Sequence, residues 1–235
     1  MPDGAGGRPE REAGPPVRRF HLEASSNGRT ADFGSAYEGS NPSASTSSHG
    51  KPANLRVEVR AMPRPRRLLV VALGSVGLKL RAGVREALQQ VLHLDVDAGP
   101  VLERPRYAFN EARRQYHTAA ILRRLSALRP AAEPLPVLGL ADVDLFLPDA
   151  SFVLGDADRD AGAALVSTAR LATRDLPLLL ARARVEAIHE AGHLLGLGHC
   201  EDHRCAMFLS RELAEVDRKG PGLCQGCRHA LGLEH

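Results

Sequence analysis

The feature that most constrains this chain is a cluster of three histidines and one glutamate. His189 and His193 are four residues apart, so on an α-helix their imidazoles lie one above the other and point at the same position. Glu190 follows the first histidine and lies beside that position. Gly196 allows the helix to end in a left-handed turn, after which the chain can bring His199 back towards the other two. This spacing predicts a zinc site with a general base next to it.

An ordinary amphipathic core helix is the main alternative for this stretch. Residues 181–188 and the pair Leu194 and Leu195 place apolar side chains at helical intervals, as such a helix requires. Catalytic zinc, however, commonly takes three protein ligands and leaves one position for water, which is the number of histidines available here. The glycine and the third histidine at fixed offsets favour the metal site.

A second candidate metal site follows immediately and uses every cysteine of the protein. The cysteines form two short pairs, Cys200 with Cys205 and Cys224 with Cys227, separated by a longer loop. This pattern suits a closed zinc site in which four thiolates at about 2.3 Å saturate the metal. Two disulfides that staple a small subdomain are the competing interpretation, and the lack of a convincing secretory signal counts against them. We interpret His203, inside the first pair, as a solvated loop residue.

The combined string of histidines, glutamate and cysteines, with Met207 between the two cysteine pairs, resembles the archaemetzincins, a family of metzincin zinc peptidases. The resemblance covers residues 187–227 with every motif residue in the family's order, and a weaker likeness extends back to about Arg67. Phe208 follows Met207, so the tyrosine that supports the transition state in some metzincins is absent at that position.

The resemblance implies a zinc-dependent metallopeptidase that hydrolyses peptide bonds with a zinc-activated water, with Glu190 as general base and Met207 as the Met-turn residue beneath the metal. It also implies two Zn²⁺ per chain. The implied ligands of the catalytic zinc are His189, His193 and His199, and those of the structural zinc are Cys200, Cys205, Cys224 and Cys227. A non-catalytic zinc-binding module for protein interactions, built on the same fold, is the alternative function.

The composition of the chain excludes some classes of binding partner. With 235 residues, 43% hydrophobic and 25% charged, the chain is long enough for one enzyme-sized domain. The net charge is +3, but the arginines are scattered and aromatic residues make up only 4%, so we expect no nucleic-acid surface. No apolar run approaches the roughly 20 residues of a membrane helix. We therefore expect a cytoplasmic monomer that acts on a peptide or protein.

The first 61 residues differ from the rest. They are rich in Gly, Pro, Ser and Arg and lack periodic apolar positions, which predicts a disordered or spurious N-terminal extension. Residues 27–42 resemble a mistranslated transfer-RNA gene, and Met62 directly precedes the first hydrophobic run. We therefore assign the peptidase-like domain to residues 62–235, with Met62 as a candidate start.

The order of the expected elements indicates an α+β fold. We expect strands at residues 68–76, 93–97, 138–147, 151–155 and 163–171, and helices at 82–92, 110–128 and from about Pro177 through the histidine motif. The resemblance implies a metzincin-like arrangement: a twisted mixed sheet, an active-site helix and a small zinc-stapled C-terminal subdomain. It also implies that residues 152–154 form the edge strand beside an extended substrate.

Two groups of carboxylates invite other chemistry. Asp142 and Asp144 alternate as on one face of a strand, where capping or an ion pair with arginine is commoner than acid-base work. Asp156, Asp158 and Asp160 suggest calcium, but the segment lacks the glycine and the bidentate glutamate of an EF-hand loop. We assign no catalytic or calcium-binding role to either group.

Overall fold

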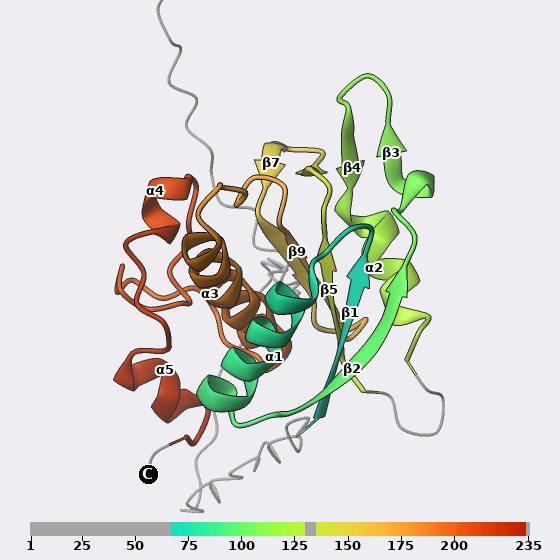
Figure 1. Ribbon diagram of the computed structural model, residues 1–235. Helices are drawn as coiled ribbons and strands as arrows, with labels where there is room; N and C mark the ends of the chain where they lie inside the picture. Colours follow the sequence, from blue (N-terminus) through green and yellow to red (C-terminus); the bar gives the residue numbers. More distant parts are fainter. Residues whose placement is uncertain (1–66, 130–134, 234–235) are drawn as a thin grey trace, which may run out of the picture. The chain divides into compact units, whose positions relative to one another are not determined.

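The computed structural model describes residues 67–129 and 135–233, so the expected N-terminal extension lies outside the described residues. Its centre is a five-stranded sheet with the strand order β2-β1-β5-β9-β8 (Figure 1). Neighbours are parallel except for β8, which is antiparallel to β9. The strands are β1 (Arg67–Leu73), β2 (Asp95–Leu102), β5 (Val137–Ala141), β8 (Gly155–Asp158) and β9 (Ala163–Ser167). The result is the mixed sheet that the resemblance implies, with β8 at one edge.

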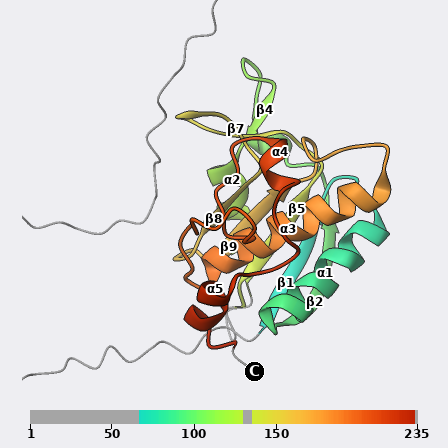
Figure 2. The same cartoon turned by 90° about the vertical axis from the view of Figure 1, so that its left-hand side faces the viewer.

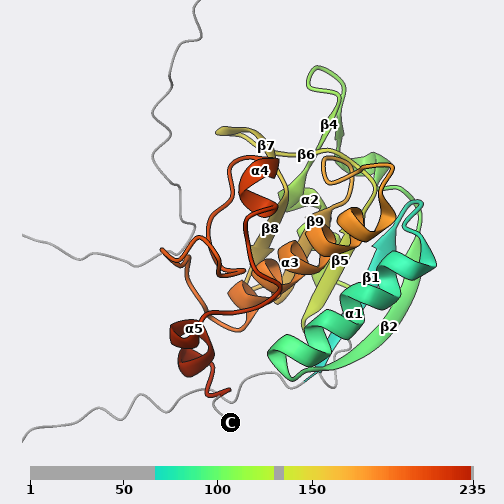
Figure 3. The same cartoon turned by 60° about the vertical axis from the view of Figure 1, so that its left-hand side comes forward.

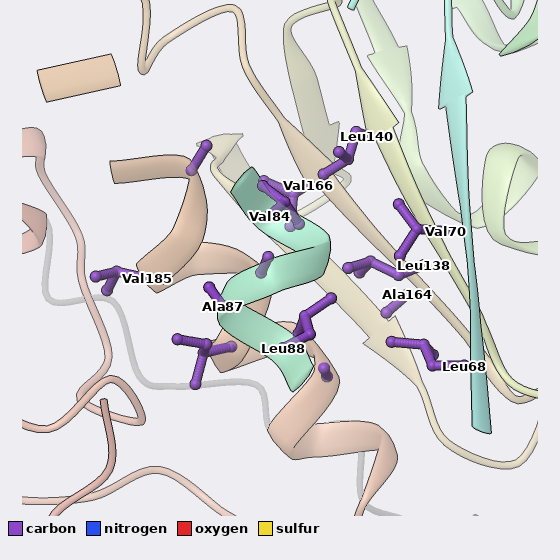
Figure 4. Packing of buried hydrophobic residues seen from close by; sticks show 14 of the residues in the cluster. Leu68, Val70, Val84, Ala87, Leu88, Leu138, Leu140, Ala164, Val166 and Val185 are labelled. Atoms are coloured by element: carbon purple, nitrogen blue, oxygen red, sulfur yellow. The ribbon is translucent and has the colours of Figure 1, made fainter. Parts of the chain in front are cut away.

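Helices cover both faces of this sheet. Helices α1 (Leu78–Leu92) and α3 (Leu176–Leu194) lie side by side on one face, and α2 (Thr118–Ser126) lies on the other (Figure 1). Successive strand residues point to opposite faces, so β1, β5 and β9 each contribute side chains to two hydrophobic cores. The close-up in Figure 4 shows Val84 and Leu88 of α1 facing Val70 and Leu138 of the strands. Helix α3, which carries the histidine motif, thereby rests on a rigid support.

A smaller four-stranded sheet, in the order β3-β4-β6-β7, adjoins the first. Its strands are β3 (Phe109–Asn110), β4 (Gln115–His117), β6 (Leu145–Leu147) and β7 (Ala150–Val153), and a short 3-10 helix, η1 (Arg106–Ala108), precedes it. The prediction of a helix over residues 110–128 is therefore wrong for the first half of that range, where the chain forms β3 and β4. The side chain of Asn110 accepts a hydrogen bond from the backbone of Arg113, and Arg114 has a φ of 52°, so the chain turns into a β-hairpin there.

The strands around residues 138–171 also differ from the prediction. The expected strand at 138–147 is two strands, β5 and β6, because the chain leaves the central sheet at Asp142. Residues 152–154 do not form the edge of the central sheet. That edge is β8, which takes up part of the expected polar turn because its backbone pairs with β9 from Gly155↔Val166 to Asp158↔Ala163.

The two aspartates after β5 are structural. Asp142 accepts hydrogen bonds from the guanidinium of Arg104 and from the backbone N–H of Ser75, at 2.6 and 2.9 Å. Asp144 pairs with Arg170 at 2.5 Å. Ion pairs with arginine are thus confirmed for both, although the two residues lie in a connection rather than on a strand.

The chain after α3 folds back along that helix with little regular structure (Figures 2 and 3). Its described residues, up to 233, contain only two short helices, α4 (Leu213–Val216) and α5 (Gln225–Ala230). Within the described part of the chain, no helix is both long and apolar enough to cross a membrane. Because the C-terminal segment has so little regular structure, it is held in place by long-range side-chain and backbone contacts, which are described below.

Candidate metal centre and active site

Helix α3 has well-defined ends that place the histidines. The Asp175 side chain caps its first turn by accepting from Leu178 N–H at 3.4 Å, and Pro177 lies inside that turn. At the other end Gly196 has a φ of 92°, and its N–H donates to His193 O at 2.9 Å. This left-handed turn reverses the chain, as the sequence predicts.

The turn brings the three histidines together. One ring nitrogen from each of His189, His193 and His199 lies within 4.8 Å of the others. The Nε2 atoms of His189 and His193 are 3.1 Å apart. His189 is buried, His193 is half-buried and His199 is exposed, so the cluster opens to solvent on one side.

In two of these rings, the nitrogen that points away from the cluster, Nδ1, is held by a backbone carbonyl. His189 Nδ1 is 2.8 Å from Ala206 O, and His193 Nδ1 is 2.9 Å from Leu197 O. A carbonyl oxygen only accepts, so each Nδ1 carries a proton, and in the neutral imidazoles each Nε2 presents a lone pair. Two such lone pairs 3.1 Å apart repel unless a proton or a metal cation lies between them. This arrangement is typical of metal-binding histidines, whose second nitrogen is commonly held by a carbonyl.

The environment favours the neutral form of the histidines, which is the form that binds metal. Burial, more than any other cause, holds the pKa of His189 well below its ordinary value of 6.5. Burial also lowers the pKa values of His193 and His199. Metal binding therefore requires little deprotonation of these groups near neutral pH.

Glu190 lies next to this cluster in a buried position against β8. A Cβ atom on Gly155 would lie only 2.7 Å from Glu190 Cγ and Cδ, and closer still to Oε1, so only glycine leaves room for the carboxylate. Burial raises the pKa of Glu190 well above its ordinary value of 4.5, and the nearby carboxylates of Glu186 and Asp156 raise it further. A carboxylate with a raised pKa is a stronger base, which suits proton transfer near neutral pH.

Met207 lies under the motif, as the resemblance implies. Its side chain is fully buried, and its Sδ and Cε pack where a Cβ on Gly192 would be. Met207 O accepts from Cys200 N–H at 2.9 Å, so the turn that carries the methionine is tied to the residue after His199. Gly192, in the middle of the histidine motif, has no side chain and thus allows the turn that carries Met207 to pack closely against α3.

The four cysteines form the second cluster. All four are free thiols, and their Sγ atoms lie within 4.8 Å of one another. Cys200 Sγ and Cys224 Sγ are 3.7 Å apart. Four thiolates bound at about 2.3 Å to a tetrahedral ion stand about 3.8 Å apart, whereas a disulfide needs about 2.05 Å. The spacing fits a four-thiolate metal site. The exposed His203, between the first two cysteines, is not part of it.

Three features of the site have no motif in the sequence: the glycine at 155, the carbonyl of Ala206, and a buried ion pair between Glu186 and Lys219 at 3.0 Å. In the sequence, Glu186 looks like any polar residue of an amphipathic helix. The only signal for Lys219 in the sequence is the rarity of lysine.

Comparison with known proteins agrees with this geometry. Residues 93–232 match the model of peptidase family M54. The archaemetzincin of Methanopyrus kandleri is 42% identical over 127 residues, which cover 54% of this chain and 71% of that protein. The archaemetzincin of Aeropyrum pernix is 35% identical over 164 residues, covering 69% of this chain and 89% of the relative.

Solved structures show the same likeness over most of their length. The crystal structure of the M. kandleri archaemetzincin has a TM-score of 0.66 at 35% identity and covers 73% of this chain and 97% of that one. A zinc-dependent peptidase from Methanocorpusculum labreanum has a TM-score of 0.65 at 32% identity, covering 70% and 99%. Fold, site and relatives together define a zinc metallopeptidase. The chain belongs to peptidase family M54, the archaemetzincins.

Proposed function

We propose that His189, His193 and His199 hold the catalytic zinc of this peptidase and that Glu190 is its general base. The observation that carries the proposal is the pair of Nε2 lone pairs, 3.1 Å apart, with both Nδ1 atoms engaged by carbonyls. The buried carboxylate of Glu190 is the neighbouring group that can accept a proton. These residues supply the three ligands and the one base that zinc-assisted hydrolysis of a peptide needs.

Zn²⁺ bound at this site would polarise the scissile carbonyl and lower the pKa of a bound water from 15.7 towards about 7. The protein's own contribution is proton transfer and exclusion of water. Glu190 accepts the proton of the attacking water and returns it to the leaving amine, and burial of its carboxylate keeps competing water away. The backbone around Gly155 fixes the side on which this carboxylate lies.

We also infer that the cysteine cluster, Cys200, Cys205, Cys224 and Cys227, holds a second zinc with a structural role. Four thiolates saturate a tetrahedral ion and leave no position for substrate. Without metal, burial and the neighbouring thiols raise the pKa of Cys227, so a divalent cation is what would keep this crowded cluster ionised. The second zinc would close a loop that has little regular structure of its own.

The substrate is best accommodated along β8. This strand ends the central sheet, so its outer backbone groups have no strand partner among the described residues. Its first residue, Gly155, contacts Glu190, and Arg159, just past its end, lies over Gly196. An extended peptide that adds to this edge would therefore run past the base and the histidines.

Zinc content and peptide hydrolysis of three variants test the proposal. Wild type should contain two zinc ions per chain by elemental mass spectrometry, His193→Ala should contain one, and Glu190→Gln should keep two while losing hydrolysis of a quenched-fluorescence peptide library. His203→Ala is the matched control, because this histidine is exposed and outside both clusters. A Glu190→Gln variant that retains wild-type hydrolysis would refute the role of Glu190, and unchanged zinc in His193→Ala would refute the ligand assignment.

A further inference from the structure

Two ion pairs join helix α3 to the segment that follows α4. Arg182 binds both carboxylate oxygens of Asp217, at 2.6 and 2.7 Å, and Lys219 Nζ lies 3.0 Å from Glu186 Oε1. Arg182, Glu186 and Glu190 follow one another at four-residue intervals, so all three lie on one face of the helix. The second ion pair is therefore one helical turn from the proposed base.

The Glu186–Lys219 pair is shielded from water. The side chain of Lys219 is 0% exposed and that of Glu186 is 4% exposed. The pair is thus unlike the surface ion pairs of the protein, such as Arg184 with Glu86. Burying two charges is unfavourable unless they meet in good geometry, so separating Glu186 from Lys219 would leave an uncompensated buried charge and disfavour any arrangement that parts the two segments.

The segment that carries Lys219 also holds the backbone that orients His189. Gly220 N–H, next to Lys219, donates to Arg204 O at 2.7 Å, and Ala206 N–H donates to Gly222 O at 2.9 Å. Ala206 O in turn accepts from His189 Nδ1 at 2.8 Å. A continuous series of short contacts therefore runs from Glu186 through Lys219 and the Ala206 backbone to a histidine of the metal centre.

We propose that Lys219 is a positioning residue of the histidine metal centre: its buried ion pair with Glu186 fixes the segment whose Ala206 carbonyl orients His189. The inference rests on the proposed function, because it takes His189 as a zinc ligand. Lys219 touches neither substrate nor metal in this role. It sets the tautomer and the direction of His189 through the backbone, as outer-shell partners of metal ligands commonly do.

The test measures the affinity of the histidine site for zinc by chelator competition, with the cysteine site loaded in advance. Lys219→Met should weaken the histidine site about 10- to 100-fold, the usual effect of losing an outer-shell partner. Lys219→Arg, which keeps the positive charge, should recover most of that loss. Lys79→Met is the matched control, because Lys79 is exposed on α1 and should leave the affinity unchanged.

A second variant separates positioning from stability. Lys219→Met leaves Glu186 as a buried unpaired carboxylate, and this alone could lower the melting temperature. Glu186→Gln combined with Lys219→Met removes both charges, so the melting temperature should return towards the wild-type value. Zinc affinity of the histidine site should stay weakened in the double variant, because the contact that fixes the Ala206 segment is still missing.

The outcomes distinguish this inference from the proposed function. Wild-type protein that binds no zinc at its histidines would overturn the proposed function and, with it, the role of Lys219. Wild-type protein that binds zinc there, with equal affinity in Lys219→Met or in the folded double variant, would overturn only the positioning role. Weakened affinity in both variants, recovered by Lys219→Arg, is the expected result.

Discussion

Substitution of Gly155 by alanine is a direct test of how closely β8 packs against Glu190. The backbone of Gly155 lies in a strand and does not need the left-handed region, so alanine fits its conformation. The added methyl group, however, would lie 2.7 Å from both Cγ and Cδ of Glu190. The single change therefore acts on the proposed base and leaves the backbone and the histidines in place.

The size of the effect follows from this distance. Ordinary van der Waals contact begins at 3.4 Å, so the Glu190 side chain must move by at least 3.4 − 2.7 = 0.7 Å, and its Oε1 by more. The carboxylate is buried, so this shift must take place within the protein interior. A misplacement of about 1 Å in an active site costs about 100-fold in rate, so we expect kcat to fall about 100-fold.

Kinetics and zinc content together decide the outcome. In Gly155→Ala, kcat for a cleaved peptide should fall while zinc content stays near wild type. The forced shift of the buried Glu190 side chain should also lower the free energy of unfolding by about 1–3 kcal/mol, as overpacking of a buried site does. Gly77→Ala is the matched control, since a Cβ there meets nothing within 4 Å. Wild-type kcat in a folded, zinc-loaded Gly155→Ala protein would refute the argument that this contact sets the position of the base.

Three further predictions concern the helix end, the cysteine cluster and the buried carboxylate. Gly196→Ala should lower the free energy of unfolding by about 1–2 kcal/mol in urea titrations, because Gly196 has a φ of 92° and a Cβ in the left-handed region is strained. Cys227→Ser should reduce the zinc content from two ions to one by elemental mass spectrometry and lower the melting temperature, since a three-thiolate site is left open. In metal-free protein, burial and then the charges of Glu186 and Asp156 raise the pKa of Glu190 above its ordinary 4.5, so wild type should lose stability relative to Glu190→Gln as pH rises from about 4.5 through that raised pKa. A gap in unfolding free energy that stays constant over this pH range would contradict the last prediction.

The parts of the site that could be predicted from the sequence are those that depend on local geometry. Helical spacing places His189 and His193 on one face, and a glycine after the helix allows the turn to His199. The clustering of the cysteines follows in the same way from two short spacings. Each of these inferences needs only a few neighbouring residues and no knowledge of the rest of the fold.

The parts that could not be predicted depend on distant segments. The hairpin at Asn110 replaces a helix because the chain there pairs with β6, which comes about thirty residues later. The edge strand begins at Gly155 because β9 supplies its partner. Polar residues such as Asp156 look like a turn in the sequence, since nothing local shows that a neighbouring strand will satisfy the backbone.

The two proposed metal sites are built from interleaved residues, so neither is independent of the other. His199 precedes Cys200, and Cys205 precedes Ala206, whose carbonyl holds His189. Loss of metal from the cysteine cluster would therefore free the same stretch of backbone that orients the histidines. The C-terminal segment has too little regular structure to hold this stretch alone, and the buried Lys219 supplies an attachment to α3 that does not depend on metal. With metal bound by the cysteines, the chain would secure the turn that carries Ala206 twice, once through thiolates and once through the Glu186–Lys219 ion pair, and each attachment should limit the damage when the other is lost.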